Sequence, residues 1–244
     1  MTLGSIIRNL TGHPAERPSP AKAKRTLSRD ERRHVQFSFS QFGEDLAVMR
    51  HFENRLGFYV DIGAHHPIRF SNTHSLYRRG WSGINVDANE EAIELFKIQR
   101  PRDVNLQGAV SNEVREVEFS LYEDSALSRI ELTSGPAAAG NSRMPPPARK
   151  VRLQTTTLER LLSEHLPRQQ AIDFLNVDCE GHDLAVLTSN DWTRFRPELV
   201  AVEDWQMEGE SAIDRFLATQ GYALAFLQKP AKIFVRAAPS AATA

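Results

Sequence analysis

Acidic and hydroxyl side chains stand where several apolar segments of this sequence end, and such groups can bind ligands or move protons. The stretch FYVDIGAHHP, which begins at Phe58, places Asp61 and Gly63 at the end of an apolar run. Similar runs are followed by Asp87, Ser111, Asp178 and Glu203. Carboxylates accept hydrogen bonds, serve as general bases and ligate hard cations. These residues predict a site if the fold brings the segment ends together.

Gly63 allows a tight backbone turn, but the residues after it do not supply a pyrophosphate cradle. A dinucleotide fingerprint needs further glycines here, where this chain has His65, His66 and Pro67. A ligand that joins adenosine to a smaller zwitterionic arm fits better, and S-adenosylmethionine is such a ligand. The adjacent histidines point apart in extended backbone, so we expect them to border the pocket rather than to share a metal ion.

Asp87 stands near the spacing of roughly 20 residues after the glycine turn at which an acidic side chain binds ribose hydroxyls. A carboxylate can accept hydrogen bonds from both vicinal hydroxyls. The alternative interpretation is a helix cap, since we expect a helix to begin at Glu90. The order of Asp61, Gly63 and Asp87 along the chain favours ribose binding.

The composition is that of an ordinary globular protein and gives no reason to expect nucleic-acid binding. The chain has 244 residues, a formal net charge of -1, 41% hydrophobic residues and 25% charged residues. We expect no membrane span, because no stretch approaches roughly 18 apolar residues, and the first apolar run is too short for a secretory signal. The single cysteine, Cys179, excludes an internal disulfide and favours a reducing, cytoplasmic compartment.

Segments of helical and strand character alternate along the chain. We predict helices over residues 41–56, 71–79, 90–99, 158–165, 182–188 and 212–220. We predict strands over residues 58–62, 83–86, 104–110, 115–122, 151–155, 172–177 and 199–202, with a final hairpin of 222–227 and 232–236. This order predicts a Rossmann-like α/β fold with a doubly wound, mostly parallel sheet, in which ligands bind at the carboxyl ends of the strands.

The ends of the chain and one internal segment differ in composition from the rest. Residues 1–36 are basic and interrupted by prolines, so we expect a flexible N-terminal tail. Residues 37–237 would form a single domain, followed by a flexible C-terminal tail over 238–244. The small-residue and proline-rich stretch 134–149 predicts a mobile loop that could cover the site.

Five motifs in their order resemble the FkbM-type S-adenosylmethionine-dependent methyltransferases. They are SQFGED (40–45), VDIGAHHP (60–67), SNT (71–73), RGWSGINVDAN (79–89) and FLNVDCEGHDLAVLTSNDW (174–192). The resemblance implies a class I methyltransferase fold, a seven-stranded sheet with an antiparallel last strand. It also implies methyl transfer to a hydroxyl of a small-molecule or glycan acceptor, often a sugar. A chain of this size further resembles the nodulation methyltransferases, which place a 2-O-methyl group on the fucose of lipo-chitooligosaccharides.

The resemblance assigns a role to each matching residue. The residues implied to bind S-adenosylmethionine are Gln41, Glu44, Asp61, Gly63, Ala64, Asn72, Asp87 and Ser111. Asp61, Gly63 and Ala64 would face the methionine arm, Asp87 the ribose, and the segment Ala109, Val110 and Ser111 the adenine. Asp178 matches the acid of the DxEG motif at the end of the fourth parallel strand.

The proton of the accepting hydroxyl can be handled in two ways, which the sequence leaves open. In the first, a general base takes it directly, and the candidates at the strand ends are Asp178, Glu180, His182 and Glu203. In the second, Asp178, Glu203 and Asp204 hold Mg²⁺, which binds the acceptor and lowers the pKa of its hydroxyl.

Other functions remain as alternatives. A nicotinamide or flavin oxidoreductase would use a similar sheet, but the second and third glycines of its fingerprint are missing. A binding module without catalysis would not need the acids at the strand ends. Within the methyltransferases, a carboxyl group, an amine or a non-sugar natural product could replace the sugar acceptor.

Overall fold

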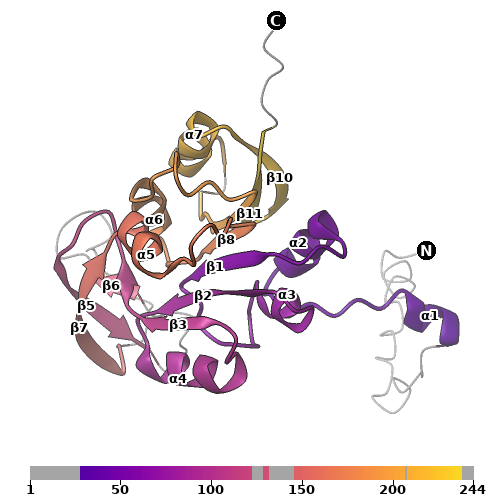
Figure 1. Ribbon diagram of the computed structural model, residues 1–244, viewed down its shortest axis with the longest axis horizontal. Helices are drawn as coiled ribbons and strands as arrows, with labels where there is room; N and C mark the ends of the chain where they lie inside the picture. Colours follow the sequence, from indigo (N-terminus) through magenta and orange to yellow (C-terminus); the bar gives the residue numbers. More distant parts are fainter. Residues whose placement is uncertain (1–27, 123–128, 132–145, 207, 238–244) are drawn as a thin grey trace, which may run out of the picture. The chain divides into compact units, whose positions relative to one another are not determined.

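The computed structural model describes residues 28–122, 129–131, 146–206 and 208–237. The chain divides into two compact units, Met1–Phe37 and Ser38–Ala244 (Figure 1). In the first unit, helix α1 (Arg29–Arg33) begins after Ser28, whose side chain accepts a hydrogen bond from the backbone of Glu31. The tails expected at 1–36 and 238–244 and the loop expected at 134–149 lie wholly or largely outside the described residues.

The second unit is built around a sheet that has seven strands within the described ranges, in the order β10-β11-β9-β8-β1-β2-β3. Strands β3, β2, β1, β8 and β9 pair in parallel, and β11 runs antiparallel to both β9 and β10. This confirms the predicted mostly parallel sheet with an antiparallel strand. The strands are β1 (Phe58–Ile62), β2 (Ser82–Asp87), β3 (Val104–Gln107), β8 (Phe174–Val177), β9 (Leu199–Glu203), β10 (Tyr222–Gln228) and β11 (Ala231–Arg236).

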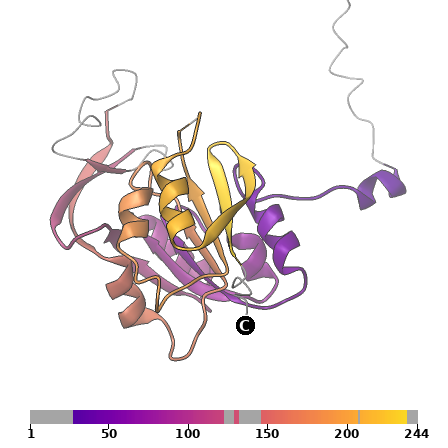
Figure 2. The same cartoon turned by 90° about the horizontal axis from the view of Figure 1, so that it is seen from above.

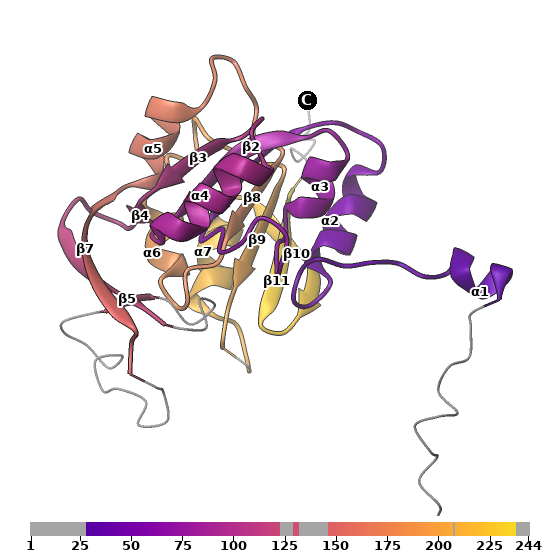
Figure 3. The same ribbon diagram turned by 90° about the horizontal axis from the view of Figure 1, so that it is seen from below.

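Helices cover both faces of this sheet (Figures 2 and 3). One face carries α2 (Glu44–Phe52), α3 (His74–Arg78) and α4 (Glu90–Gln99), and we name it the α2–α4 face. The other carries α5 (Leu158–His165), α6 (Asp183–Thr188) and α7 (Ala212–Thr219), and we name it the α5–α7 face. Each of these six helices lies within a predicted range, whereas α1 lies in the segment expected to be a flexible tail. Over the residues that the structure describes, no helix has the length and apolarity needed to span a bilayer.

Strand β1 shows how the order of residues assigns side chains to the two faces. Phe58, Val60 and Ile62 belong to the core that packs against α5, α6 and α7. Tyr59 lies in the other core, with residues of α2 and α3. Because successive side chains of a strand alternate, Asp61 points with Tyr59 toward the α2–α4 face. The buried strand β1 thus presents one carboxylate, that of Asp61, to the α2–α4 face.

A smaller sheet extends from the end of β3. The strand predicted over 104–110 is broken at Gly108, whose backbone nitrogen donates to the Asp87 carbonyl oxygen at 3.0 Å. The chain then enters a second sheet, four-stranded over the described residues, in the order β4-β7-β5-β6. Its strands are β4 (Ala109–Val110), β5 (Glu116–Leu121), β6 (Arg129–Glu131) and β7 (Arg149–Thr156). The sequence predicts β5 and β7 as strands, but not that they leave the main sheet.

Candidate active site

Neighbouring strands place polar residues side by side near the carboxyl edge of the main sheet. Asp61 on β1 is the register partner of Asn176 on β8, although the two lie 115 positions apart in the chain. The register of β8 and β9 brings Asp178 beside Glu203 in the next row. By the alternation of side chains along a strand, all four point toward the α2–α4 face. The fold therefore gathers residues from three strands at one edge.

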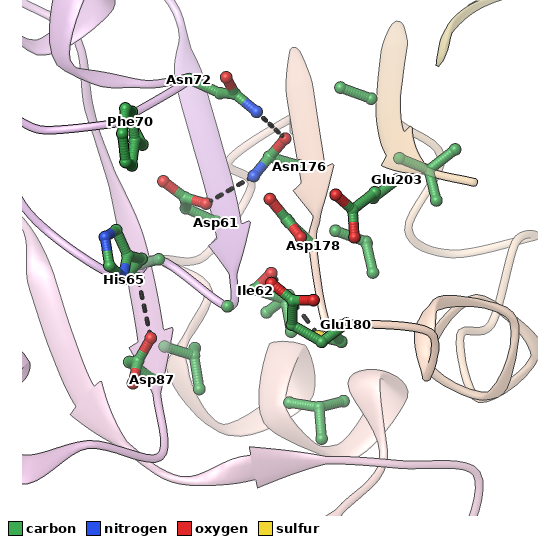
Figure 4. Close-up of a pocket in the computed structure, with 18 of the residues that line it drawn as sticks. Asp61, Ile62, His65, Phe70, Asn72, Asp87, Asn176, Asp178, Glu180 and Glu203 are labelled. Atoms are coloured by element: carbon green, nitrogen blue, oxygen red, sulfur yellow. Dashed lines mark hydrogen bonds between the residues drawn. The ribbon is translucent and has the colours of Figure 1, made fainter. Parts of the chain in front are cut away.

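A cavity opens at this edge (Figure 4). The predicted cofactor-binding residues that line it are Gln41, Glu44, Asp61, Gly63, Ala64, Asn72 and Asp87. The predicted catalytic residues that line it are Asp178 and Glu203. Aromatic and small residues complete the wall, among them His65, Phe70, Ala109, Val110 and Phe119. Most of the residues singled out in the sequence thus share one cavity.

Asp61 is held by hydrogen bonds on both of its oxygens. Thr73 Oγ1 donates to Asp61 Oδ2 at 2.7 Å, and Asn176 Nδ2 donates to Asp61 Oδ1 at 2.9 Å. Asn72 Nδ2 in turn donates to Asn176 Oδ1 at 2.9 Å (Figure 4). Burial raises the pKa of Asp61, while these hydrogen bonds and the charge of Arg100 oppose the rise. The chain of amides fixes both Asp61 and Asn72 at the cavity wall.

Gly63 is required by the packing of two strand ends as well as by its backbone conformation. Its φ is +80°, in the region that favours glycine, and a Cβ there would lie 1.8 Å from the carbonyl oxygen of Asp178. Its backbone nitrogen donates to the Val86 carbonyl at 3.0 Å. The close neighbour of this glycine is therefore the protein's own β8 strand end, and not only a ligand as the sequence suggested.

Asp87 does not cap helix α4. The cap is Asn89, whose side chain accepts a hydrogen bond from the backbone of Glu91. The Asp87 carboxylate instead accepts from the backbone nitrogens of His65 and Asn89, both at 2.8 Å. Burial raises its pKa, and these two hydrogen bonds oppose the rise. Asp87 thus stands oriented at the cavity wall, with lone pairs left for further donors.

The SQFGED segment forms the loop that leads into α2. Asp45 is fully buried and accepts hydrogen bonds from the hydroxyls of Ser38 and Ser75, each at 2.7 Å. These bonds tie the loop to α3 and so hold it over the sheet edge. Gln41 and Glu44 then lie on the cavity wall.

Three carboxylates form an acidic cluster at the end of β8 and β9. Oxygens of Asp178, Glu180 and Glu203 all lie within 4.8 Å of one another (Figure 4). Burial raises the pKa of Asp178 well above its ordinary value, and the charge of Glu203 raises it further. Burial also raises the pKa of Glu203, although Trp205 Nε1 donates to its Oε2 at 2.7 Å. Adjacent carboxyl groups of this kind hold a proton between them up to higher pH than an isolated one.

Asp204 does not join this cluster. Its Oδ2 accepts a hydrogen bond from Lys232 Nζ at 2.9 Å, and both side chains are buried. Because the ammonium group already satisfies this carboxylate away from the cavity, Asp204 is poorly placed to ligate a cation there. The expected acidic group is corrected accordingly: the third member beside Asp178 and Glu203 is Glu180.

His182 and Ser111 pair with each other outside the cavity wall. The Ser111 hydroxyl lies 2.9 Å from Nε2 of His182, and neither residue is among those described that line the cavity. Ser111 is fully buried, and burial lowers the pKa of His182. The predicted adenine contact of Ser111 and the predicted base role of His182 therefore lack support from this placement. Ala109 and Val110 are the residues of this segment that reach the cavity.

Two residues of the site were not identified from the sequence. Asn176 had a detectable signal, because a polar residue inside the apolar run FLNV must find hydrogen-bond partners when buried. Arg100 had none, since it reads as an ordinary charged residue at the end of a helix. In the fold it is fully buried and donates to Thr73 Oγ1 at 2.7 Å, next to Asp61.

The fold and the cavity define an α/β protein that binds a small ligand at the carboxyl edge of a parallel sheet. A family model described as the methyltransferase FkbM domain matches residues 61–224. The chain belongs to this family, which confirms the resemblance seen in the motifs. Membership supports methyl transfer as the activity and S-adenosylmethionine as the methyl donor.

Two further comparisons complete this result. A solved structure described as "METTL16 MTase domain (crystal form 2)" is similar with a TM-score of 0.43 and 10% sequence identity. The match covers 79% of this chain and 64% of that chain, so it spans less than two thirds of the solved structure. The comparison with curated proteins gives no match.

The cavity offers acceptors that suit S-adenosylmethionine. Asn72 Oδ1 is buried and has no hydrogen-bond partner among the described residues, and it lies on the wall with Asp61. An ammonium group, such as that of the methionine arm, would satisfy the Asn72 oxygen. Asp87 keeps acceptor capacity for ribose hydroxyls. The residues present therefore fit this group.

Proposed function

We propose that this protein is an S-adenosylmethionine-dependent O-methyltransferase that acts on a hydroxyl of a neutral sugar. The observation that carries the proposal is the position of Asp178 and Glu203. These two carboxylates have raised pKa values and line the same cavity as the residues that fit the methyl donor. A base next to the donor site is what a protonated hydroxyl acceptor requires.

The donor-binding residues have the task of orientation. When bound, S-adenosylmethionine supplies a methyl group that is already activated on a sulfonium. Asp61 and Asn72 would hold the ammonium of its amino acid arm, and Asp87 would accept from both ribose hydroxyls. Fixing both ends of the donor limits the methyl group to one direction of approach, and such alignment contributes several kcal/mol to a transfer reaction.

Asp178 and Glu203 would handle the proton of the acceptor. As the methyl group would pass from the sulfonium sulfur to the hydroxyl oxygen, with S-adenosylhomocysteine as the leaving group, the proton of that hydroxyl would pass to the ionised carboxylate of the pair. The other carboxyl group of the pair can stay protonated before the transfer, because mutual repulsion disfavours two ionised carboxylates at this distance. A base of this kind contributes about 10²–10⁴-fold to the rate.

The charge of the cavity supports a neutral acceptor. Three carboxylates whose oxygens lie within 4.8 Å of one another repel a carboxylate or phosphate group on an incoming substrate. This disfavours carboxyl methylation, which was an alternative from the sequence. Trp205 is 59% exposed and donates to Glu203, so this aromatic side chain stands beside the base and could pack against a sugar ring.

The route through Mg²⁺ is the competing mechanism, with Glu180 in the place that was expected for Asp204. Carboxylate oxygens are ligands that Mg²⁺ accepts. The two routes differ in a simple measurement. Turnover that is unchanged after dialysis against a chelator supports the direct base, whereas turnover that is lost and restored by Mg²⁺ supports the metal.

The proposal is tested with S-adenosylmethionine that carries a deuterated methyl group. Acceptors are offered in matched sets: fucosylated and rhamnosylated oligosaccharides, the same sugars as uronic acids, and amino sugars. Mass spectrometry should find the label on a neutral sugar oxygen and not on the uronic acid carboxyl. Label on an amine or a carboxyl group, with none on any hydroxyl, contradicts the proposal. The fucosylated lipo-chitooligosaccharide of the nodulation hypothesis belongs in the first set.

A further inference from the structure

Arg100 is a cation enclosed within the α2–α4 face, directly after helix α4. Its side chain is fully buried. It donates hydrogen bonds to Thr73 Oγ1 at 2.7 Å, to Ser71 Oγ at 2.8 Å and to the Pro67 carbonyl oxygen. The guanidinium also lies over the Phe96 ring, 4.9 Å from its centroid. A buried charge with this many partners fixes the loop that runs from residue 67 to residue 73.

The bond from Arg100 to Thr73 determines how the threonine hydroxyl is used. A guanidinium can only donate, so Thr73 Oγ1 is an acceptor toward Arg100 and keeps its own hydrogen for another partner. That hydrogen goes to Asp61 Oδ2 at 2.7 Å. The two hydrogen bonds therefore have the same donor-to-acceptor direction, from Arg100 to Thr73 and from Thr73 to Asp61. We call this pair of hydrogen bonds the relay.

The other oxygen of Asp61 orients the side-chain amides of Asn176 and Asn72. Asp61 Oδ1 accepts from Asn176 Nδ2, which leaves Asn176 Oδ1 to accept from Asn72 Nδ2. This orientation of the Asn72 amide leaves its Oδ1 without a partner among the described residues. The free acceptor at the cavity wall is therefore the last member of a chain that begins at Arg100.

Arg100 also balances the charge of Asp61. The carboxylate is 2% exposed, and burial favours its protonated form. Arg100 opposes this effect. Three further ionisable groups interact electrostatically with Asp61, namely the acids Asp87 and Asp178 and the Tyr59 hydroxyl. None of these three can supply a positive charge.

We propose that Arg100 is a positioning residue for the methyl donor: through Thr73 it keeps Asp61 ionised and orients the acceptors that receive the ammonium of the amino acid arm. The inference rests on the proposed use of S-adenosylmethionine. Lysine cannot take this role, because one ammonium group does not reach the Ser71 hydroxyl, the Thr73 hydroxyl and the Pro67 carbonyl in the planar arrangement of a guanidinium.

The experiment measures the binding of S-adenosylhomocysteine by titration calorimetry between about pH 6 and pH 9, so that protonation of Asp61 is read as a pH-dependent affinity. Thr73→Val removes the relay and keeps the shape of the side chain and the charge of Arg100. Arg100→Met removes the charge. Arg102→Met is the matched control: Arg102, two positions further along the chain, is exposed and donates to the carbonyl oxygens of Tyr77 and Trp81, which do not line the cavity.

We expect the wild-type protein and Arg102→Met to bind with the same Kd at each pH. Thr73→Val should bind roughly tenfold more weakly, the effect of one hydrogen bond to a charged group. Arg100→Met should bind weakly at the acidic end and recover affinity as the pH rises, because Asp61 then needs a higher pH to ionise. A purely structural arginine would lower the melting temperature and leave the pH profile parallel to that of the wild type.

The outcomes separate the two proposals. If the wild-type protein does not bind S-adenosylhomocysteine, the proposed function fails, and this inference fails with it. If the wild-type protein binds, and folded Thr73→Val and Arg100→Met bind with its Kd and its pH profile, only the inference about Arg100 fails. Should Arg100→Met not fold, Thr73→Val decides alone.

Discussion

The acids of the cavity differ in their partners, and the partners suggest different tasks. Asp61 accepts one hydrogen bond on each oxygen, from a hydroxyl and from an amide of the fold, and keeps lone pairs for a further donor. Asp87 accepts hydrogen bonds from two backbone nitrogens, those of His65 and Asn89, and these bonds fix its carboxylate. Burial raises the pKa of Asp178, and the acids that surround it raise it further. A carboxylate fixed by donors suits binding, whereas one whose pKa is raised by burial and by neighbouring acids suits proton transfer.

Asp87→Asn should weaken the binding of S-adenosylhomocysteine roughly tenfold to hundredfold, because a hydrogen bond to a charged group contributes about 1.5–3 kcal/mol. The amide keeps the size of the side chain, and its oxygen can still accept from one backbone nitrogen, so the fold should persist. Calorimetric titration measures the effect. Glu94→Gln, on the exposed face of α4, serves as the control. An Asp87→Asn protein with wild-type affinity would remove the ribose assignment.

Asp178→Asn should lower kcat about 10²–10⁴-fold while the affinity for S-adenosylhomocysteine stays close to that of the wild type. In the wild-type protein, activity should rise with pH through the raised pKa of the Asp178–Glu203 pair, since the base must be ionised. The acidic limb of the pH–rate profile should therefore lie above the ordinary carboxyl range. A limb near the ordinary range, or normal kcat in Asp178→Asn, contradicts the assignment.

Among the elements, the contact between the ends of β1 and β8 sets the shape of the cavity. The β1 turn at Gly63 approaches the carbonyl of Asp178, and the β8 turn continues through Glu180 and Gly181, both with positive φ. Asp183, at the start of α6, accepts from the backbone nitrogens of Cys179 and Gly181 at 3.1 Å each. The acidic cluster is thus held by two turns and one helix start.

Gly63→Ala and Gly181→Ala form a matched pair that tests this contact. Both glycines have positive φ, which costs an alanine about 1–2 kcal/mol. At Gly181 a Cβ would meet nothing within 4 Å, but at Gly63 it would lie 1.8 Å from the Asp178 carbonyl oxygen. Gly63→Ala should therefore lose clearly more unfolding free energy than Gly181→Ala in urea titrations. Equal losses would show that the two strand ends are not in contact.

Over the entire fold, several buried acids lie on the α2–α4 side of the sheet, and Asp183 lies at the start of α6 on the other side. Burial raises the pKa of carboxyl groups in several elements, namely Asp61, Asp87, Asp103, Asp178, Asp183 and Glu203. Such groups bind protons more readily in the folded state than in the unfolded state. Their contribution to stability is complete below the unfolded pKa and is lost as the pH rises through the folded pKa.

Asp183 gives the clearest case, because burial raises its pKa to about 7. Between about pH 4 and pH 7 its contribution to the unfolding free energy should fall by roughly 4 kcal/mol at most, at about 1.4 kcal/mol for each pH unit. Asp183→Asn should remove this part of the pH dependence. The check is urea denaturation across that range, with exposed Glu164→Gln as the control. An unchanged slope in Asp183→Asn would contradict a raised pKa.

The elements of the fold were largely predictable, and the reasons are local. Helix α4 was predicted with its observed ends, because an apolar stripe over 90–99 is closed by Pro101. Strand β1 was equally clear. The separate small sheet was not predictable, because a break at Gly108 alone does not say which strand β4 will join. The family itself was recognisable from the short motifs, because all five occur in this chain in the order that is typical of the family.

The chain's residues alone decide which segments alternate between strand and helix and which acids end the strands, because periodicity and turn residues act over a few positions. Which of those acids meet is set by strand register, packing and buried ion pairs. Glu180 joins Asp178 because the turn after β8 curls back, and Asp204 is withdrawn by Lys232, 28 positions away. The burial of Arg100 beside Asp61 likewise depends on contacts between distant segments. These long-range contacts carry no local pattern, so only the folded chain reveals them.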